Sequence, residues 1–285
     1  MNRLNVFAPF FLVACATAPE GLRETPSGDG PTVVIDWDAR PLPELPYPND
    51  LATRSDLTSP TGLRLNISTE AATTELEART RRKFNELYGF GIYMPITVRF
   101  DAPLDLDEIA LRHDIDGDVS DDAFFLIDVT PGSPTYLQPA ELDVGHGRFP
   151  EDVARTDVYF PNDAHVDMPS LLFDTHDEDV NDNGVLDWGE DVDNDGWLDV
   201  PNVYPVGGDP REDLLTWYER LTDTLIFRPV VPLREETTYA VVLTERLIGE
   251  DGNPVRSPWE YVNHTRQTGA LVPLEEALPD LGLST

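Results

Sequence analysis

Alternating apolar and polar positions predict several short β-strands along this chain. The clearest alternation is in MPITVRFDAPLD (94–105), where Ile96, Val98 and Phe100 occupy one face of a half-buried strand. Further strands are predicted at 31–39, 123–129, 223–233 and 237–247, and less strongly at 135–144 and 157–160. EDGNPV (250–255) has the composition of a turn.

A helical period replaces this alternation between residues 68 and 88. Ser68 is the predicted N-cap, Glu70 lies in the first turn where the helix dipole favours an acid, and Gly89 is expected to end the helix. One face of the helix is formed by Leu76, Thr80, Phe84 and Leu87.

A second, shorter helix is predicted after residue 208. Asp209, Pro210 and Glu212 have the spacing of an N-cap, a proline at the first helical position and the far end of a capping box. The helix would continue through Leu214, Leu215, Tyr218 and Leu221.

Short strands separated by turns, with few helices, favour a mainly β fold over alternating βα units. We expect an antiparallel β-sandwich with peripheral helices and an inserted acidic segment. The expected organisation is a signal peptide (1–15), a flexible tether (16–30), an extended segment with a helix (31–92), the sandwich (93–265) with its insertion (174–202), and a C-terminal helix and tail (266–285).

The chain is strongly acidic, with a net charge of −34 over 285 residues. Such a surface repels phosphate backbones and anionic headgroups, so nucleic acid and anionic membrane surfaces are poor partners, whereas cations are attracted. Lys83 is the only lysine, so nearly all the basic residues are arginines.

The N-terminus has the layout of an export signal. A basic residue, Arg3, precedes an apolar run from Val6 to Ala14, which is too short to span a bilayer. Leu12-Val13-Ala14-Cys15 resembles the lipobox of bacterial lipoproteins. The resemblance implies that Cys15 is lipidated and that the protein is exported and anchored at the outer membrane or cell surface of a Gram-negative bacterium. The alternative is an ordinary export signal followed by an unrelated cysteine.

Two segments carry a recognisable pattern. The first is ITVRFDAPLD, and the second is LIFRPVVPLREETTYAVVLTERLIGEDGNPV, in which the pattern residues are Pro229, Pro232, Leu233, Thr238, Tyr239, Val241, Leu243 and Gly252. They resemble the opening and closing parts of an S-layer-type bacterial Ig-like domain, and the resemblance implies that the β-sandwich is Ig-like. YPNDLATRSDLTSPTGLRLN (47–66) is similar to a segment that precedes such domains in exported proteins, some of which carry a downstream α/β-hydrolase.

The stretch from 179 to 202 consists of two abutting twelve-residue units that agree position by position. Acid or amide side chains at positions 1, 3 and 5, glycine at 6, a backbone carbonyl at 7, a ligand at 9 and glutamate at 12 are the pattern of a calcium loop. The first unit has the whole set: Asp179, Asn181, Asn183, the carbonyl of Val185, Asp187 and Glu190. The second has Asp191, Asp193, Asp195, the carbonyl of Trp197 and Asp199, but ends in Asn202.

An all-oxygen ligand set favours Ca²⁺ over Mg²⁺, which prefers a tighter octahedron, and over Zn²⁺, which prefers histidine and cysteine. We expect one Ca²⁺ in the first unit and a second, incomplete site in the second. Because no helices flank the loops, they resemble the calcium repeats of thrombospondin type 3 modules more than EF-hands. The alternative is a disordered acidic run, against which stand repeated glycines and leucines and apolar residues available for packing: Val180, Leu186, Trp188, Val192, Trp197 and Leu198.

The sequence lacks the G-x-S-x-G, H-E-x-x-H, Walker and G-x-G-x-x-G motifs. The first hypothesis is therefore a non-enzymatic calcium-binding Ig-like domain of a surface lipoprotein, in which calcium is structural. The second is the accessory region of a larger exported hydrolase, with the remainder encoded downstream. The third is an adhesin for an extracellular protein or polysaccharide, which no particular residue identifies.

Overall fold

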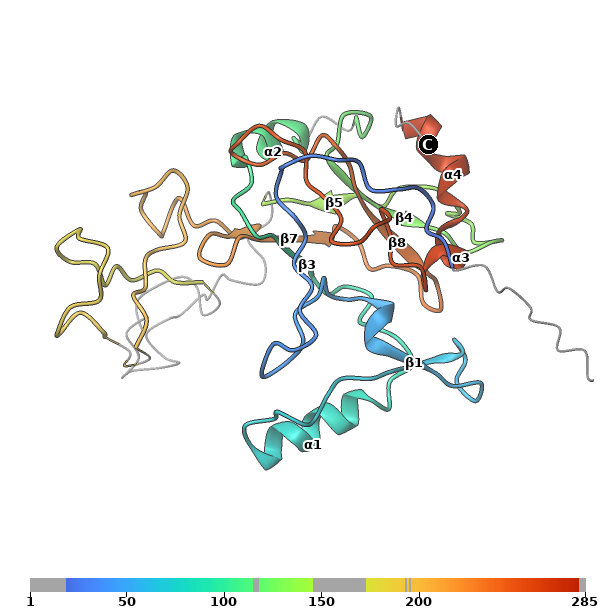
Figure 1. The fold of residues 1–285 in the computed structure, drawn as a ribbon, viewed down its shortest axis with the longest axis horizontal. Helices are drawn as coiled ribbons and strands as arrows, with labels where there is room; N and C mark the ends of the chain where they lie inside the picture. The colour runs from blue at the N-terminus through green and yellow to red at the C-terminus, as the bar shows by residue number, and fades with distance from the viewer. Residues whose placement is uncertain (1–18, 115–117, 146–172, 193, 195, 282–285) are drawn as a thin grey trace, which may run out of the picture.

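The computed structural model describes residues 19–114, 118–145, 173–192, 194 and 196–281 (Figure 1). Its elements in chain order are η1 (Asp50–Ala52), β1 (Thr53–Ser55), β2 (Leu63–Leu65), α1 (Glu75–Phe84), β3 (Ile96–Arg99), α2 (Leu106–Arg112), β4 (Phe124–Asp128), β5 (Leu142–Asp143), β6 (Tyr218–Glu219), β7 (Thr224–Pro229), β8 (Tyr239–Leu243), α3 (Thr268–Leu271), α4 (Leu274–Ala277) and η3 (Leu278–Leu281). No helix among these is long and apolar enough to cross a membrane.

The strands form antiparallel sheets. Central strand β7 pairs with β3 along one edge, and with β5 and β6 along the other. A separate ribbon is made by β4 and β8, which pair from Phe124–Leu243 to Asp128–Tyr239. Strands β1 and β2 form a short hairpin that lies with α1 below the main body in the view of Figure 1. The described residues therefore have a β-rich, antiparallel fold with few helices.

Strand β4 is buried on both faces and separates two apolar clusters. Because side chains alternate along a strand, Phe124 and Leu126 pack with the buried side of β3 and β7, whereas Phe125 and Ile127 pack with the C-terminal helices. The rings of Phe124 and Phe227 lie 4.7 Å apart and join the two sheets. The main core thus lies between the β4–β8 ribbon and the four-stranded sheet.

The strongest strand predictions are confirmed and the weaker ones need correction. Strands β3, β4, β7 and β8 lie within the predicted segments, and residues 250–255 form a turn in which Gly252 has φ +75°. Residues 31–39 make isolated bridges rather than a strand, because single residues there pair with different partners. Only 142–143 of the segment 135–144 is strand, since Leu137 has φ +61° within a turn. Residues 157–160 lie outside the described residues.

Helix α1 is shorter than predicted and begins at a different cap. Thr74, not Ser68, is the N-cap, and its hydroxyl accepts a hydrogen bond from the Glu77 amide at 3.1 Å. The Glu77 carboxylate in turn accepts bonds from Thr73, so a capping-box spacing lies six residues beyond the predicted start. The helix ends at Phe84, five residues before Gly89.

The buried side of α1 is polar. Arg81 is the buried residue of the helix, and its guanidinium donates to the carbonyls of Pro41 and Ser68 and pairs with Glu77. The predicted face lies on the exposed side instead: Leu76 is 63% exposed and Phe84 47% exposed. Leu87, the last residue of the predicted face, lies beyond the end of the helix, and periodicity gives no information on which side of a helix is covered.

The helix predicted from Asp209 is absent. One turn forms, with the Asp213 amide donating to the Asp209 carbonyl at 2.7 Å, and the chain then becomes extended and enters β6. The reason is pairing with the end of the insertion, because the Leu215 amide donates to the carbonyl of Asn202 at 2.8 Å. Pairing across the chain therefore overrides the local capping signal.

Asp128 provides a pH-dependent contribution to stability. Burial alone would raise the pKa of this carboxyl, but hydrogen bonds from Ser133, Thr130 and Thr135 outweigh it and lower the pKa below its usual value. A carboxyl with a lowered pKa stabilises the fold above its unfolded pKa and loses this contribution as pH falls through the folded pKa.

We expect Asp128→Asn to lower the free energy of unfolding by about 1–3 kcal/mol at pH 7, because the amide cannot accept all three bonds. The difference from wild type should shrink below about pH 4. Urea unfolding of both proteins from pH 7 to 3 measures the difference in the free energy of unfolding. A difference that stays constant over this range would contradict the lowered pKa of Asp128.

Candidate metal site

The acidic segment lies between β5 and β6 in sequence and projects from one side of the body, where Figure 1 shows it in yellow and orange. Asn202 joins its end to the core. The Asn202 amide donates to the carbonyls of Leu215 and Tyr218 at 2.7 and 2.8 Å, and its oxygen accepts from the Arg220 amide at 3.0 Å. With 3% exposure and all these bonds made, Asn202 is an anchor rather than a calcium ligand.

The two ends of the segment are held together by backbone hydrogen bonds. The backbone amide of Asn202 donates to the Asp174 carbonyl at 2.8 Å, and the backbone amide of Glu178 donates to the Asp199 carbonyl at 3.0 Å. The two units are therefore closed at their base, with the acidic loops on the outside.

The two units repeat in backbone conformation as well as in sequence. Positions 4 and 6 are left-handed in both: φ is +55° at Asp182 and +72° at Gly184, then +65° at Asn194 and +84° at Gly196. Left-handed backbone favours glycine, and nothing lies within 4 Å of the missing side chain at either glycine. The glycines are therefore required by the turn, as the sequence predicts, and not by a close neighbour.

In the first unit, the side chains of positions 3, 5, 9 and 12 meet. The Asp187 Oδ2 accepts bonds from the amides of Asn181 and Asn183 at 3.0 and 2.8 Å. Asn181 also donates to Glu190 Oε1 at 3.0 Å, and Glu190 Oε2 accepts from the Asp187 backbone amide at 2.9 Å. The side chain of position 1, Asp179, caps the turn and accepts bonds from the backbone amides of positions 5 and 6.

This donor set fits a cation, although within the described residues no three acidic, histidine or cysteine side chains form a ready metal-ligand group. The NH₂ groups of the two asparagines donate hydrogen bonds to the carboxylates of Asp187 and Glu190, so uncharged N–H donors stand where a cation would contact these oxygens. An amide rotated by 180° would present its oxygen at the same place, giving oxygen ligands from positions 3, 5, 9 and 12.

In the second unit, Asp193 and Asp195 lie outside the described residues. Oδ1 of Asp191 at position 1 is buried and has no hydrogen-bond partner in the part of the chain that the structure describes. Asp199 at position 9 is buried, and the Trp197 side chain at position 7 is exposed. Of the second predicted ligand set, the structure thus describes Asp191, Trp197 and Asp199.

Glu178 is a site residue that the sequence pattern did not identify. It is 1% exposed, and its carboxylate accepts the amides of Val192 at 2.5 Å and Asp199 at 3.2 Å, which are positions 2 and 9 of the second unit. Glu190 accepts the position 9 amide of the first unit in the same way. Glu178 thus occupies in the second unit the role that Glu190 has in the first. The signal was the repeated Glu-Asp-Val at 178–180 and 190–192.

The apolar residues of the loops do not form the packing that the sequence suggests. Leu186 and Leu198 are half-buried, whereas the four others are exposed, Trp188 completely: Val180, Trp188, Val192 and Trp197. Two twelve-residue loops are too small to enclose their own aromatic side chains, so these point away from the base of the segment.

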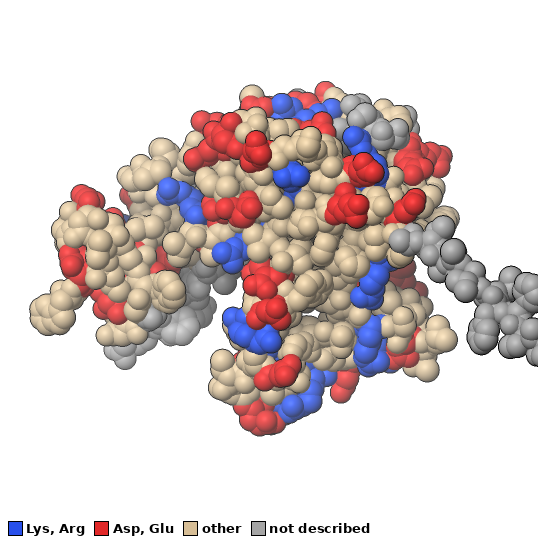
Figure 2. All heavy atoms as spheres, in the orientation of Figure 1, with Lys and Arg blue, Asp and Glu red and all other residues tan. Residues whose placement is uncertain are grey.

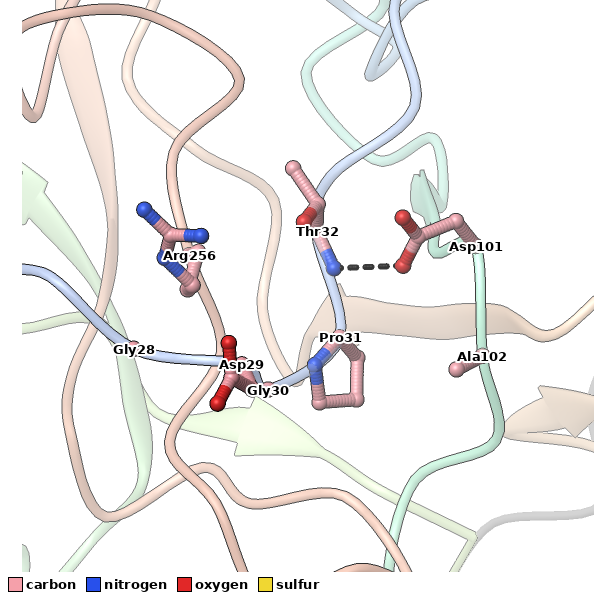
Figure 3. A pocket seen from close by; sticks show the side chains of 8 residues that line it. All are labelled: Gly28, Asp29, Gly30, Pro31, Thr32, Asp101, Ala102 and Arg256. Atoms are coloured by element: carbon pink, nitrogen blue, oxygen red, sulfur yellow. Dashed lines mark hydrogen bonds between the residues drawn. The ribbon is translucent and has the colours of Figure 1, made fainter.

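A pocket of about 290 Å³ lies elsewhere, between the strand-like segment at 28–32 and the turn after β3 (Figure 3). The Thr32 amide donates to Asp101 Oδ1 at 2.6 Å, and Arg256 lies on the opposite side of the pocket. The described residues that line this pocket include Thr32 and two aspartates, Asp29 and Asp101, and among them there is no histidine, cysteine or serine.

Comparison of the chain with protein-family models, with curated proteins and with solved structures found no match. The acidic segment is therefore assigned from its own geometry.

The role of Asn202 is open to a direct test. Asn202→Ala should lower the free energy of unfolding by about 1–3 kcal/mol, because buried carbonyls and an amide lose their partner. Calcium stoichiometry should not change, since the side chain faces β6 and not the loops. Calorimetric titration beside thermal unfolding measures both quantities, and loss of one bound calcium would show that Asn202 is a ligand.

Proposed function

We propose that this protein is a non-enzymatic, calcium-binding Ig-like β-sandwich domain of an exported lipoprotein, in which calcium has a structural role. The observation that carries the proposal is the repeat itself: two abutting loops share left-handed positions 4 and 6 and a glutamate on the amide of position 9. The sandwich architecture is supported by antiparallel pairing and by the apolar cluster shared between the ribbon and the four-stranded sheet.

The proposed ligands of the first ion are those of the first unit, with Asp179, Asn181, Asn183, Asp187, Glu190 and the carbonyl of Val185. The second ion would use Asp191, Asp193, Asp195, Asp199 and the carbonyl of Trp197, with Glu178 in place of the missing twelfth ligand. From Asp174 to Asp199 there are eleven acidic residues and no Lys or Arg. Calcium would relieve their repulsion, and an affinity of roughly 10⁻⁴ to 10⁻³ M is typical of extracellular modules.

Calorimetric titration tests the binding. The full chain is titrated first with Ca²⁺ and then with Mg²⁺ at the same concentration. We expect heat and a stoichiometry of two for Ca²⁺, with weaker or no binding of Mg²⁺, because flexible loops with many oxygens suit the larger ion. Absence of heat at millimolar Ca²⁺ would contradict the proposal.

The proposed export and anchoring depend on Cys15, which lies outside the described residues. Cys15→Ser should release the protein from the membrane fraction into the soluble fraction of the cell envelope, because one short apolar run does not anchor a chain stably. Fractionation and immunoblotting of the two proteins measure the change. Membrane association that survives the substitution would show that Cys15 is not lipidated.

A further inference from the structure

Helix α1 presents an uncovered surface that is both apolar and cationic. Leu76, Arg79, Lys83 and Phe84 are exposed and lie at the spacings that place residues on one side of a helix. We call these four residues the α1 surface. Arg81 and Arg82 pair with Glu77 and Glu75, whereas Arg79 and Lys83 form no ion pair within the described part of the chain. The α1 surface therefore carries two uncompensated positive charges beside two exposed apolar side chains.

The acidic segment carries the complementary chemistry. We call residues 174–199 the acidic loops. They contain eleven acids and no Lys or Arg, and five large apolar side chains are exposed on them: Val180, Val185, Trp188, Val192 and Trp197. Tryptophans exposed in this way are unusual on a monomer, and tryptophan is enriched in the centres of interfaces.

The two surfaces do not cover each other within one molecule. In Figure 1 the acidic loops project to one side of the body, whereas α1 lies below it, and Figure 2 shows lysine and arginine side chains on that lower part. Because the chain has a net charge of −34, most surfaces of one copy repel the surfaces of another copy. A contact between α1 and the acidic loops of another copy is attractive, because helix α1 has four basic and two acidic residues.

We propose that the acidic loops of one molecule dock on the α1 surface of a second copy of this chain. Trp188 and Trp197 would pack on Leu76 and Phe84, and the loop carboxylates would face Arg79 and Lys83. Because the two surfaces differ, the contact is head-to-tail and can repeat along a row of molecules. It does not depend on calcium, since eleven carboxylates exceed the four charges of two Ca²⁺ ions.

The single lysine makes the contact directly detectable. A zero-length carbodiimide joins an amine to a carboxylate in contact with it, and Lys83 is the only side-chain amine in the chain. Equal amounts of unlabelled and ¹⁵N-labelled full chain are mixed, cross-linked and digested. We expect peptides in which Lys83 of one isotope is joined to an acid of 174–199 of the other isotope. Cross-links confined to one isotope, or none to these acids, would overturn the proposal.

Sedimentation velocity measures the association itself. Combined Arg79→Glu and Lys83→Glu should weaken self-association by roughly tenfold or more, as removal of interface charges does. Trp188→Ala should also weaken it, and cannot disturb a core because this side chain is fully exposed. Arg23→Glu with Arg234→Glu makes the same charge change at other exposed positions and should have little effect. Lys83→Arg should retain association and lose the cross-link.

Circular dichroism confirms that each variant is folded. A chain that is monomeric at all concentrations, or association that neither the α1 variant nor Trp188→Ala weakens, would overturn the proposal. A further outcome is a protein that stays monomeric and whose Lys83 is protected from acylation only when phosphatidylglycerol vesicles are added. This result would assign the α1 surface to a membrane and would also overturn the proposed self-association.

Discussion

Phe124→Ala is expected to lower the free energy of unfolding by about 3–5 kcal/mol, which is a large part of the stability of an ordinary domain. The Phe124 side chain is completely buried and lies 4.7 Å from the Phe227 ring and 3.9 Å from the His113 ring, measured between centroids. Truncation removes apolar contacts from both sheets at once. It also leaves a cavity that the paired strands β4 and β8 cannot easily close.

Guanidinium unfolding followed by far-UV circular dichroism measures this loss. Trp188→Ala is the matched control, since it also removes a large aromatic ring but from a fully exposed position. Its effect on the free energy of unfolding should stay within about 0.5 kcal/mol. A small effect of Phe124→Ala, comparable to that of the control, would show that the ribbon and the four-stranded sheet do not share a packed core.

The strands that the sequence predicts well are those whose pattern depends on local chemistry alone. Ile96, Val98 and Phe100 alternate with polar residues, and all three are buried. The segment around β4 has no alternation because both of its faces are covered, one by the four-stranded sheet and one by the C-terminal helices. A continuous apolar run contains no information about which partner lies on which side.

Helix α1 shows what periodicity cannot determine. An amphipathic face predicts burial only when another element covers it, and here the covered side is organised around Arg81. The partners of that guanidinium include the carbonyl of Pro41, forty residues away, whose position no local pattern reveals. The start of the helix, in contrast, was readable from the capping-box spacing of Thr74 and Glu77.

The candidate metal site also has one part that a local motif predicts and another that depends on residues distant in sequence. The turns of both units follow from the positions of Gly184 and Gly196, which a local motif predicts. The roles of Glu178 and Asn202 depend on hydrogen bonds that span 13 to 21 residues in sequence. Counted from Asp179, the second unit ends without a glutamate, and the carboxylate that contacts its backbone is that of Glu178, the residue before the first unit.

Removing calcium is expected to lower the stability of the protein by about 2.7 kcal/mol for each occupied loop, when the reference contains calcium at about a hundred times its Kd. For a chain of this size the loss corresponds to a fall in Tm of about 5–10 °C per loop. The physical reason is that, with the ligands proposed above, calcium would bind the folded loops and not the unfolded chain, in which those ligands are dispersed. Thermal unfolding with calcium and with a chelator measures the difference. Equal melting temperatures would contradict a structural role for calcium.

Two glutamate variants separate the contributions of the loops. Glu190→Gln should remove the calcium-dependent stabilisation of the first loop, and Glu178→Gln that of the second, because an amide is a much weaker ligand than a carboxylate. Glu178 also accepts two backbone amides, so each variant is compared with itself in chelator, which cancels the loss of those bonds. Glu212→Gln, at an exposed position in the turn after the loops, is the control and should keep the full calcium-dependent difference. If Glu178→Gln retains two bound calcium ions, the second loop is completed by some other residue. If Glu190→Gln retains both, the convergence of the first-unit side chains around Asp187 is a hydrogen-bonded turn and not a metal site.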